Sequence, residues 1–219
     1  MKIRRRLKVR PYGERTCKEH IAATGGSGLL ESSSDAALPT KYGTFRVKAF
    51  KDRGGREHLV VYKGNVKSER VPVRVHSQCT TGDCFQSRRC DCGPQLEKAL
   101  KYVEKNGRGV VVYLAQEGRG IGLFNKINAY VLQERGFDTV DANVRLGFGS
   151  DQRDYLEAAE VIKALGVKSV LLMTNNPAKI ADLQCHGVKV AGRIPMITRP
   201  NRHNKRYLQT KKARMDQLL

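Results

Sequence analysis

The segment Gly109–Leu114, which reads GVVVYL, decides the fold class of this chain. Three consecutive valines between a glycine and two further apolar or aromatic residues favour a short strand that is buried in a sheet. A glycine-rich turn, Gln116–Gly122, follows and opens a predicted helix that carries Ile127, Tyr130 and Val131 on one side. A buried strand that leads directly into a helix is typical of α/β architecture.

The same alternation continues on both sides of this segment. Towards the C-terminus the sequence predicts, in turn, a helix, a strand, a helix and a strand over Asp154–Leu165, Ser169–Met173, Ala178–Cys185 and Val188–Ala191. Upstream it predicts three strands and one helix over Gly43–Phe50, His58–Lys63, Val71–Val75 and Pro94–Asn106. We therefore expect an α/β (mixed α+β) fold, with a strand-rich first half followed by alternating strands and helices.

Length and composition predict one folded unit with a tail. The chain has 219 residues, of which 40% are hydrophobic and 28% charged, as in a globular protein. Residues 1–36 are basic and then rich in Gly and Ser, which predicts a flexible N-terminal extension. Residues 37–219 are predicted to form a single domain that includes a basic C-terminal tail, Arg199–Arg214. The sequence shows neither a signal core nor a membrane span, so we expect a cytoplasmic protein without a membrane partner.

The chain is strongly basic, which narrows the class of partner. It carries 41 Lys and Arg against 21 Asp and Glu, a formal charge of +20, and such a surface attracts polyanions. A basic, zinc-containing nucleic-acid-binding protein is therefore one hypothesis. The aromatic content of 6%, without tryptophan, and the lack of a nucleic-acid motif argue against it. A phosphorylated small molecule fits the same charge.

Four cysteines lie within fourteen positions: Cys79, Cys84, Cys90 and Cys92. In a reducing compartment such a cluster is more typical of metal binding or chemistry than of disulfides. Three thiolates at C-x10-C-x-C leave one tetrahedral position of a zinc ion for water, whose pKa the metal lowers toward about 7. A closed structural zinc site with Cys84 as fourth ligand, and a set of inert buried thiols, are the alternatives that spacing leaves open.

Motifs along most of the chain occur in a characteristic order. The segments read RVHSQC over Arg74–Cys79, TGD over Thr81–Asp83, CDCG over Cys90–Gly93, QEGRGIGL over Gln116–Leu123, DQRDY over Asp151–Tyr155 and LMTNNP over Leu172–Pro177. This series resembles the signature of the GTP cyclohydrolase II family, and the resemblance extends over about Ala37 to Leu219. Members open the imidazole ring of GTP and release formate and pyrophosphate.

The resemblance implies specific roles for residues of this chain. Cys79, Cys90 and Cys92 are expected to hold one zinc ion per subunit, with magnesium on the triphosphate. The expected GTP-binding residues are Arg74, Val75, His76, Ser77, Gln78, Gln95, Glu117, Gly118, Arg119, Thr139, Thr174 and Lys179. Asp151 is expected as the proton acceptor, Arg153 as the nucleophile and Tyr130 as a further active-site residue. A homodimer is expected as well.

Chemistry and sequence departures keep some of these roles open. A guanidinium stays protonated, so the alternative role of Arg153 is to stabilise charge at the α-phosphate while Asp151 orients it. We also expect Lys126 to neutralise triphosphate charge. The family usually carries Glu at Gln78, Arg at Ala115 and Met-Gly-His at residues 215–217. These departures suggest a divergent paralog, with a formyl-retaining product or another purine nucleotide as the alternative activity.

Overall fold

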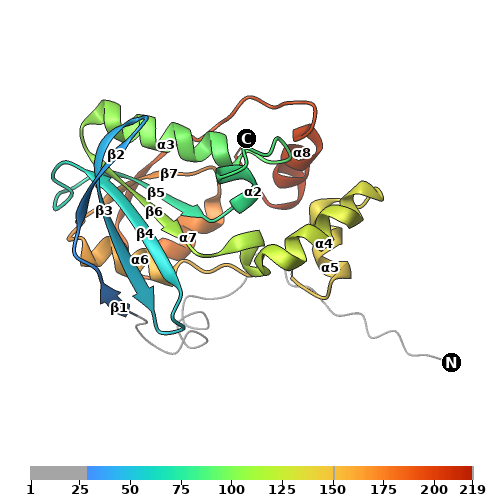
Figure 1. Ribbon diagram of the computed structural model, residues 1–219, viewed down its shortest axis with the longest axis horizontal. Helices are drawn as coiled ribbons and strands as arrows, with labels where there is room; N and C mark the ends of the chain where they lie inside the picture. The colour runs from blue at the N-terminus through green and yellow to red at the C-terminus, as the bar shows by residue number, and fades with distance from the viewer. Residues whose placement is uncertain (1–28, 150, 219) are drawn as a thin grey trace.

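The described part of the chain is built on one sheet. The computed structural model describes residues 29–149 and 151–218. Its sheet has eight strands in the order β1-β3-β4-β6-β5-β7-β8, with β2 paired to β3 (Figure 1). The strands are β1 (Leu29–Ser32), β2 (Ala36–Thr40), β3 (Gly43–Asp52), β4 (Glu57–Lys63), β5 (Val71–Ser77), β6 (Gly109–Leu114), β7 (Val170–Met173) and β8 (Val190–Ile194).

Strand β6, the GVVVYL segment, joins the two halves of this sheet. It pairs antiparallel with β4, where Val60 is opposite Val112, and parallel with β5, where Val75 is opposite Val112. Strands β7 and β8 continue the parallel half. The carboxyl ends of β5, β6 and β7 therefore meet at one edge, which is where open α/β sheets place their ligands.

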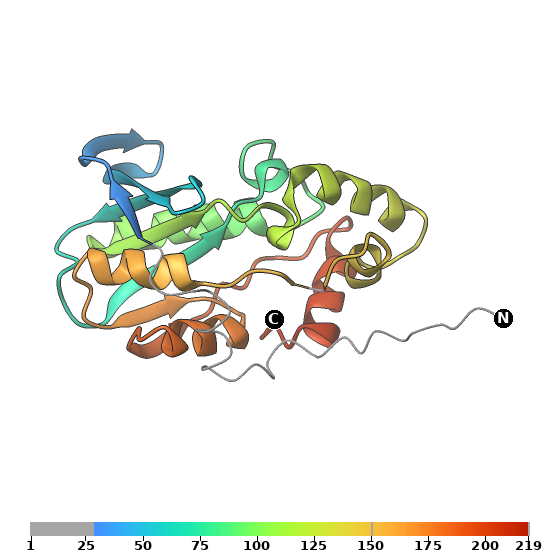
Figure 2. The same cartoon turned by 90° about the horizontal axis from the view of Figure 1, so that it is seen from below.

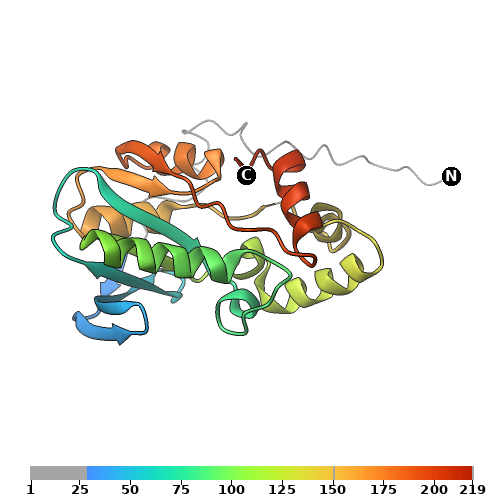
Figure 3. The same ribbon diagram turned by 90° about the horizontal axis from the view of Figure 1, so that it is seen from above.

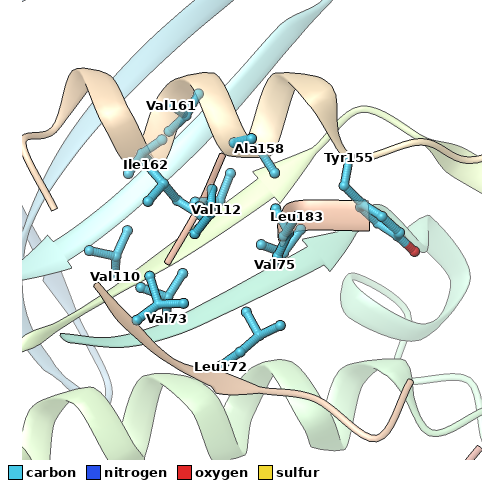
Figure 4. Close-up of a cluster of buried hydrophobic side chains, with 14 of the residues drawn as sticks. Val73, Val75, Val110, Val112, Tyr155, Ala158, Val161, Ile162, Leu172 and Leu183 are labelled. Atoms are coloured by element: carbon cyan, nitrogen blue, oxygen red, sulfur yellow. The ribbon is translucent and has the colours of Figure 1, made fainter. Parts of the chain in front are cut away.

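The alternation of side chains along the central strands creates two cores. Val73, Val75, Val110 and Val112 point to one face and pack with apolar side chains of α6 and α7 (Figure 4). Val111, between two of these valines, points to the other face and packs with Ala99 and other side chains of α3. Because successive strand residues face opposite sides, an uninterrupted valine run is stable only when both faces are covered.

Helices cover both faces and extend past one end of the sheet. Helix α3 (Cys92–Asn106) lies on one face, and α6 (Leu156–Ala164) and α7 (Pro177–Cys185) lie on the other (Figure 3). Figures 1 and 2 show the remaining long helices gathered beyond the carboxyl ends of the parallel strands: α4 (Gly122–Glu134), α5 (Thr139–Arg145) and α8 (Lys205–Arg214). The short α2 (Thr80–Asp83) follows β5, and the turn η1 (Glu117–Gly120) follows β6.

The mixed α/β class and the predicted elements are confirmed, with local differences. Helix α5 was not predicted, and residues 205–214 of the expected basic tail form α8, whose Leu208 and Thr210 are buried. Paired strands begin at Leu29, earlier than the boundary at residue 37, while residues 1–28 lie outside the described residues. None of the described helices has the length and apolarity required to cross a membrane.

Candidate functional site

Three cysteine sulfurs converge at the carboxyl edge of the sheet. The Sγ atoms of Cys79, Cys90 and Cys92 all lie within 4.8 Å of one another, and those of Cys79 and Cys90 are 3.7 Å apart. Zinc–sulfur bonds are about 2.3 Å long, so sulfurs at two corners of a tetrahedral zinc site are roughly 3.8 Å apart. The three thiols therefore fit one zinc ion. Cys84 is exposed and is not a member of this group, which removes the closed four-thiolate arrangement from consideration.

A glycine in the neighbouring backbone leaves space for the sulfur atoms. Cys79 ends the segment after β5, whereas Cys90 and Cys92 lie at the start of α3. A Cβ atom on Gly82 of α2 would lie 2.8 Å from the Sγ of Cys90 and 3.1 Å from that of Cys79. A contact of 2.8 Å is too short for a Cβ atom and one of 3.1 Å is tight, so any larger residue at position 82 would displace the sulfurs.

A buried polar network holds the first of these cysteines. The backbone N–H of Cys79 donates to Oδ2 of Asp83 at 2.9 Å, and the hydroxyl of Tyr113 donates to the same oxygen at 2.9 Å. His76 places Nε2 3.1 Å from Oδ1 of Asp83, and its ring stacks on that of Tyr113. His76 is thus a buried partner of Asp83, outside the group of thiols. Partners of this kind orient metal ligands.

The electrostatics of the three thiols favour one thiolate at Cys79. Hydrogen bonds from the thiols of Cys90 and Cys92, together with the ammonium of Lys126, hold the pKa of Cys79 far below its ordinary value. The hydrogen bond to Cys79 raises the pKa of Cys90 to about 12. The pKa of Cys92 is also raised, by its hydrogen bonds to Cys79 and Cys90. Binding of a divalent cation to this cluster must therefore release protons.

A pocket opens beside the thiols, along the carboxyl ends of β5, β6 and β7. Of the residues predicted to act at the site, the pocket is lined by Arg74, His76, Ser77, Gln78, Cys79, Cys90, Cys92, Gln95, Glu117, Gly118, Arg119, Tyr130, Thr139, Arg153, Thr174 and Lys179. Val75 and Asp151 are absent from the lining. The side chain of Val75 is fully buried in the core under α6, because neighbouring strand residues face opposite sides.

The glycine-rich turn forms one wall of this pocket. Gly118 and Arg119 both have φ of 62°, a left-handed conformation that glycine adopts freely and arginine rarely. A Cβ on Gly118 would lie 3.1 Å from Cβ of Lys126, so the turn passes close to α4. The guanidinium of Arg119 donates to Oγ1 of Thr139 at 3.1 Å, which ties the turn to the start of α5. This wall of the pocket therefore carries the positive charge of Arg119, whose position is fixed by Thr139 of α5.

Another part of the pocket lining is a chain of buried polar contacts between β5, the start of α3 and α8. Arg74 donates to Oε1 of Gln95 at 2.6 Å, and Gln95 donates to Oδ2 of Asp91 at 2.5 Å. Lys211 of α8 pairs with Oδ1 of Asp91 at 3.0 Å. Tyr207 and Lys211 both line the pocket, so the predicted basic tail contributes directly to the site.

The amine of Lys179 is buried in the pocket near β5. Its Nζ donates to the carbonyl of Val75 at 2.7 Å and lies 4.7 Å from the centre of the Tyr155 ring. Burial, with Arg74 and Arg153 nearby, lowers the pKa of Lys179 well below its ordinary value. In Figure 4 the hydroxyl of Tyr155 points away from the apolar core. An anion that enters here would stabilise the charged form of Lys179.

Sequence reasoning missed part of the site. Tyr207, Lys211, Asp91 and Asn143 line the pocket, yet we predicted no role for any of them. Lys126 was expected at phosphate, but its Nζ lies 3.2 Å from Sγ of Cys79. The only signal in the sequence was that all four lie within the stretch from about Ala37 to Leu219 that resembles the family. Among the departures from the family pattern, Gln78 and Gln217 also line the pocket, whereas Ala115 and Asp216 do not.

Comparisons with known proteins show which family this chain resembles over most of its length. The family model for GTP cyclohydrolase II matches residues 31–195. The GTP cyclohydrolase-2 of Campylobacter hominis is 53% identical over 190 residues, which cover 87% of this chain and 96% of that protein. The riboflavin biosynthesis proteins RibBA of Bacillus velezensis and Phocaeicola vulgatus are 51% and 50% identical, over 87% of this chain.

The relatives differ in length. The alignments cover 49% and 48% of the two RibBA proteins, so the chain spans about half the length of these curated relatives. The match to the Campylobacter hominis protein runs over nearly all of that protein. Because the family model covers well over half of this chain and several relatives share about half of its residues, the chain belongs to the GTP cyclohydrolase II family.

Proposed function

We propose that this protein hydrolyses the imidazole ring of GTP at a zinc ion held by Cys79, Cys90 and Cys92. The products would be formate, pyrophosphate and 2,5-diamino-6-(5-phosphoribosylamino)pyrimidin-4(3H)-one. The observation that carries the proposal is the convergence of three thiols on a pocket lined by several cations. Three sulfur ligands leave one tetrahedral position open, as catalytic zinc requires.

Different residues are proposed to act on the guanine base and on the phosphates of GTP. Zinc in this site supplies Lewis-acid activation of water at neutral pH. Gln95, fixed between Arg74 and Asp91, offers an amide for the polar edge of guanine. Tyr130 places its hydroxyl 3.1 Å from Oγ1 of Thr81, next to the thiols, where it can hold or transfer a proton during ring opening.

The triphosphate is proposed to bind at the end of the pocket away from the three thiols. Arg119 and Lys179 supply positive charge there, and magnesium bound to the phosphate oxygens would neutralise the remainder. Arg153, oriented by Asp151, is proposed to stabilise charge at the α-phosphate while water attacks, because a guanidinium is a poor nucleophile. A trapped guanylyl-arginine adduct would show instead that Arg153 attacks.

Mass spectrometry of the product made from GTP with zinc and magnesium tests this function. Formate and pyrophosphate are scored separately, and both should appear in equal amounts with the pyrimidinone. Pyrophosphate without formate would indicate the formyl-retaining alternative, and turnover only of another purine nucleotide would indicate a changed substrate. Salt-sensitive binding of RNA or DNA without any turnover of GTP would support the nucleic-acid-binding alternative.

We also propose that a second copy of this chain covers the outer face of α4. Leu123, Phe124, Ile127 and Val131 of α4 are 42%, 79%, 45% and 43% exposed, and Val144 of α5 is 45% exposed. Their spacing makes one apolar stripe, which a soluble helix normally buries. The same helix turns Lys126 and Tyr130 into the pocket, so the proposed interface lies directly behind the site.

Light scattering after gel filtration tests the dimer. The measured mass of the native protein should be twice the chain mass. The double variant Phe124→Glu and Ile127→Glu should have the mass of one chain. Phe85→Glu, which changes an equally exposed aromatic residue outside this stripe, is the control and should leave the mass unchanged. A native monomer at every concentration would refute the proposed interface.

A further inference from the structure

The ammonium of Lys126 lies between two anionic groups of the site. Its Nζ donates to Sγ of Cys79 at 3.2 Å and to Oε1 of Glu117 at 2.8 Å. The side chain of Lys126 is 11% exposed and that of Glu117 is 10% exposed. Lys126 is the fifth residue of α4, whereas Cys79 follows β5, so the contact joins two distant parts of the chain.

Glu117 extends this contact into the glycine-rich turn. Its Oε2 accepts from the backbone N–H of Thr80 at 2.6 Å, and its Oε1 accepts from that of Gly118 at 2.8 Å. Thr80 directly follows Cys79, and Gly118 belongs to the turn that walls the pocket. Lys126, Glu117 and the backbone thus close a ring of hydrogen bonds between the first metal ligand and the proposed nucleotide-binding turn.

The charges in this ring explain why a cation is needed at its centre. Three thiolates around a divalent ion carry a net charge of −1, and the carboxylate of Glu117 adds another negative charge close by. Two such groups repel each other strongly in a partly buried setting. The ammonium between them converts the repulsion into two charge-assisted hydrogen bonds.

We propose, on the basis of the proposed function, that Lys126 is a positioning residue that couples the metal centre to the nucleotide-binding turn. Its hydrogen bond withdraws electron density from the Cys79 sulfur. Its ion pair with Glu117 fixes the position of the glycine-rich turn relative to the metal ligands. This role differs from the phosphate contact expected from the sequence. Partners of metal ligands typically change affinity or activity by about 10- to 100-fold when they are removed.

Cobalt substitution provides a readout that does not depend on turnover. In the cobalt-loaded protein, the sulfur-to-metal charge-transfer band reports the energy of the sulfur lone pairs. Lys126→Met should shift this band to longer wavelength, because the hydrogen bond that stabilises those lone pairs is lost. Lys126→Arg, which keeps the positive charge, should stay close to the native band, and so should Lys98→Met, which removes an exposed lysine of α3.

Binding of inorganic triphosphate separates the two roles of Lys126. Under our proposal, Lys126→Met binds this anion within about twofold of the native protein, while Arg119→Met binds it more weakly. In turnover assays kcat should fall about 10- to 100-fold in Lys126→Met and recover partly in Lys126→Arg. Lys126→Gln replaces the methionine variant in every assay if the latter does not melt like a folded protein.

The outcomes distinguish this inference from the proposed function. An unshifted cobalt band together with weakened triphosphate binding in Lys126→Met would overturn the inference and restore the phosphate role. If native protein releases no formate from GTP but the band shifts, the positioning role stands and the proposed activity falls. If formate is released and the band does not shift, the inference alone is wrong.

Discussion

The guanidinium of Arg153 forms a two-point ion pair with the carboxylate of Asp151, with Nε 2.8 Å from Oδ1 and Nη2 2.5 Å from Oδ2. Burial raises the pKa of Asp151, but the charge of Arg153 outweighs it and holds that pKa below its ordinary value. The carboxylate is therefore ionised at neutral pH and a weak base. Its geometry suits the orientation of Arg153, which lines the pocket, better than proton abstraction.

Replacement of Asp151 tests this relationship. Asp151→Asn keeps the shape but removes the charge that orients Arg153, and a misplaced group of this kind costs about 100-fold in rate. We expect kcat/KM for pyrophosphate release from GTP to fall by about that factor while zinc content stays at the native level. Asp35→Asn, which breaks an Asp–Arg pair on the surface, is the matched control. Native rates in Asp151→Asn would refute the orienting role.

Zinc content should depend on Cys79, Cys90 and Cys92 and should not depend on Cys84. Cys79→Ser, Cys90→Ser and Cys92→Ser each remove one of the converging sulfurs, and the purified variants should hold less than one zinc per chain. Cys84→Ser removes an exposed thiol and should keep the native content. Elemental analysis of the four proteins measures this. Loss of zinc from Cys84→Ser alone would contradict the open site.

Gly82 is predicted to be irreplaceable for metal binding. Alanine at this position would place a Cβ 2.8 Å from the Cys90 sulfur and 3.2 Å from Cβ of Cys92, so the ligands must move apart. We expect Gly82→Ala to lose bound zinc to a chelator at least ten times faster than the native protein. Gly149→Ala, at a residue without positive φ and with nothing within 4 Å of the added atom, tests whether a glycine change alone has this effect.

The ion pair between Lys211 and Asp91 should stabilise the folded protein. The side chain of Asp91 is 1% exposed, and Lys211→Met would leave its charge with Gln95 as the remaining side-chain hydrogen-bond partner among the described residues. Loss of one partner of a buried pair costs about 3 kcal/mol. Denaturant unfolding should therefore show a drop of that size, and Lys212→Met, an exposed neighbour on α8, should show none.

Stability should fall with acid because two histidines are buried in the neutral form. Burial lowers the pKa of both His58 and His76 below the ordinary value of 6.5. The unfolded chain therefore binds more protons once the pH drops below about 6.5, and unfolding becomes easier, by up to about 1.4 kcal/mol per histidine and pH unit. The effect vanishes above pH 6.5. His76→Gln should halve the slope measured between pH 6.5 and 5, and an unchanged slope would contradict the assignment.

Local pattern alone determined most of the secondary structure and the candidate ligands. Three valines in a row predicted the central strand β6, and helical spacing predicted α3 from Leu96 onward, because the period of apolar residues reflects which side each one buries. The C-x10-C-x-C spacing identified the three thiols that converge, although it left the role of Cys84 open until its exposure was seen.

Tertiary structure alone decided which distant groups meet. The contact of Lys126 with Cys79 spans 47 residues, and that of Lys211 with Asp91 spans 120. No periodicity encodes such pairs, because they depend on how β5, α3, α4 and α8 come together at the carboxyl edge of the sheet. For the same reason, the spacing predicted Ile127, Tyr130 and Val131 on one side of α4, whereas the assembled fold turns Tyr130 into the pocket and leaves Ile127 and Val131 exposed.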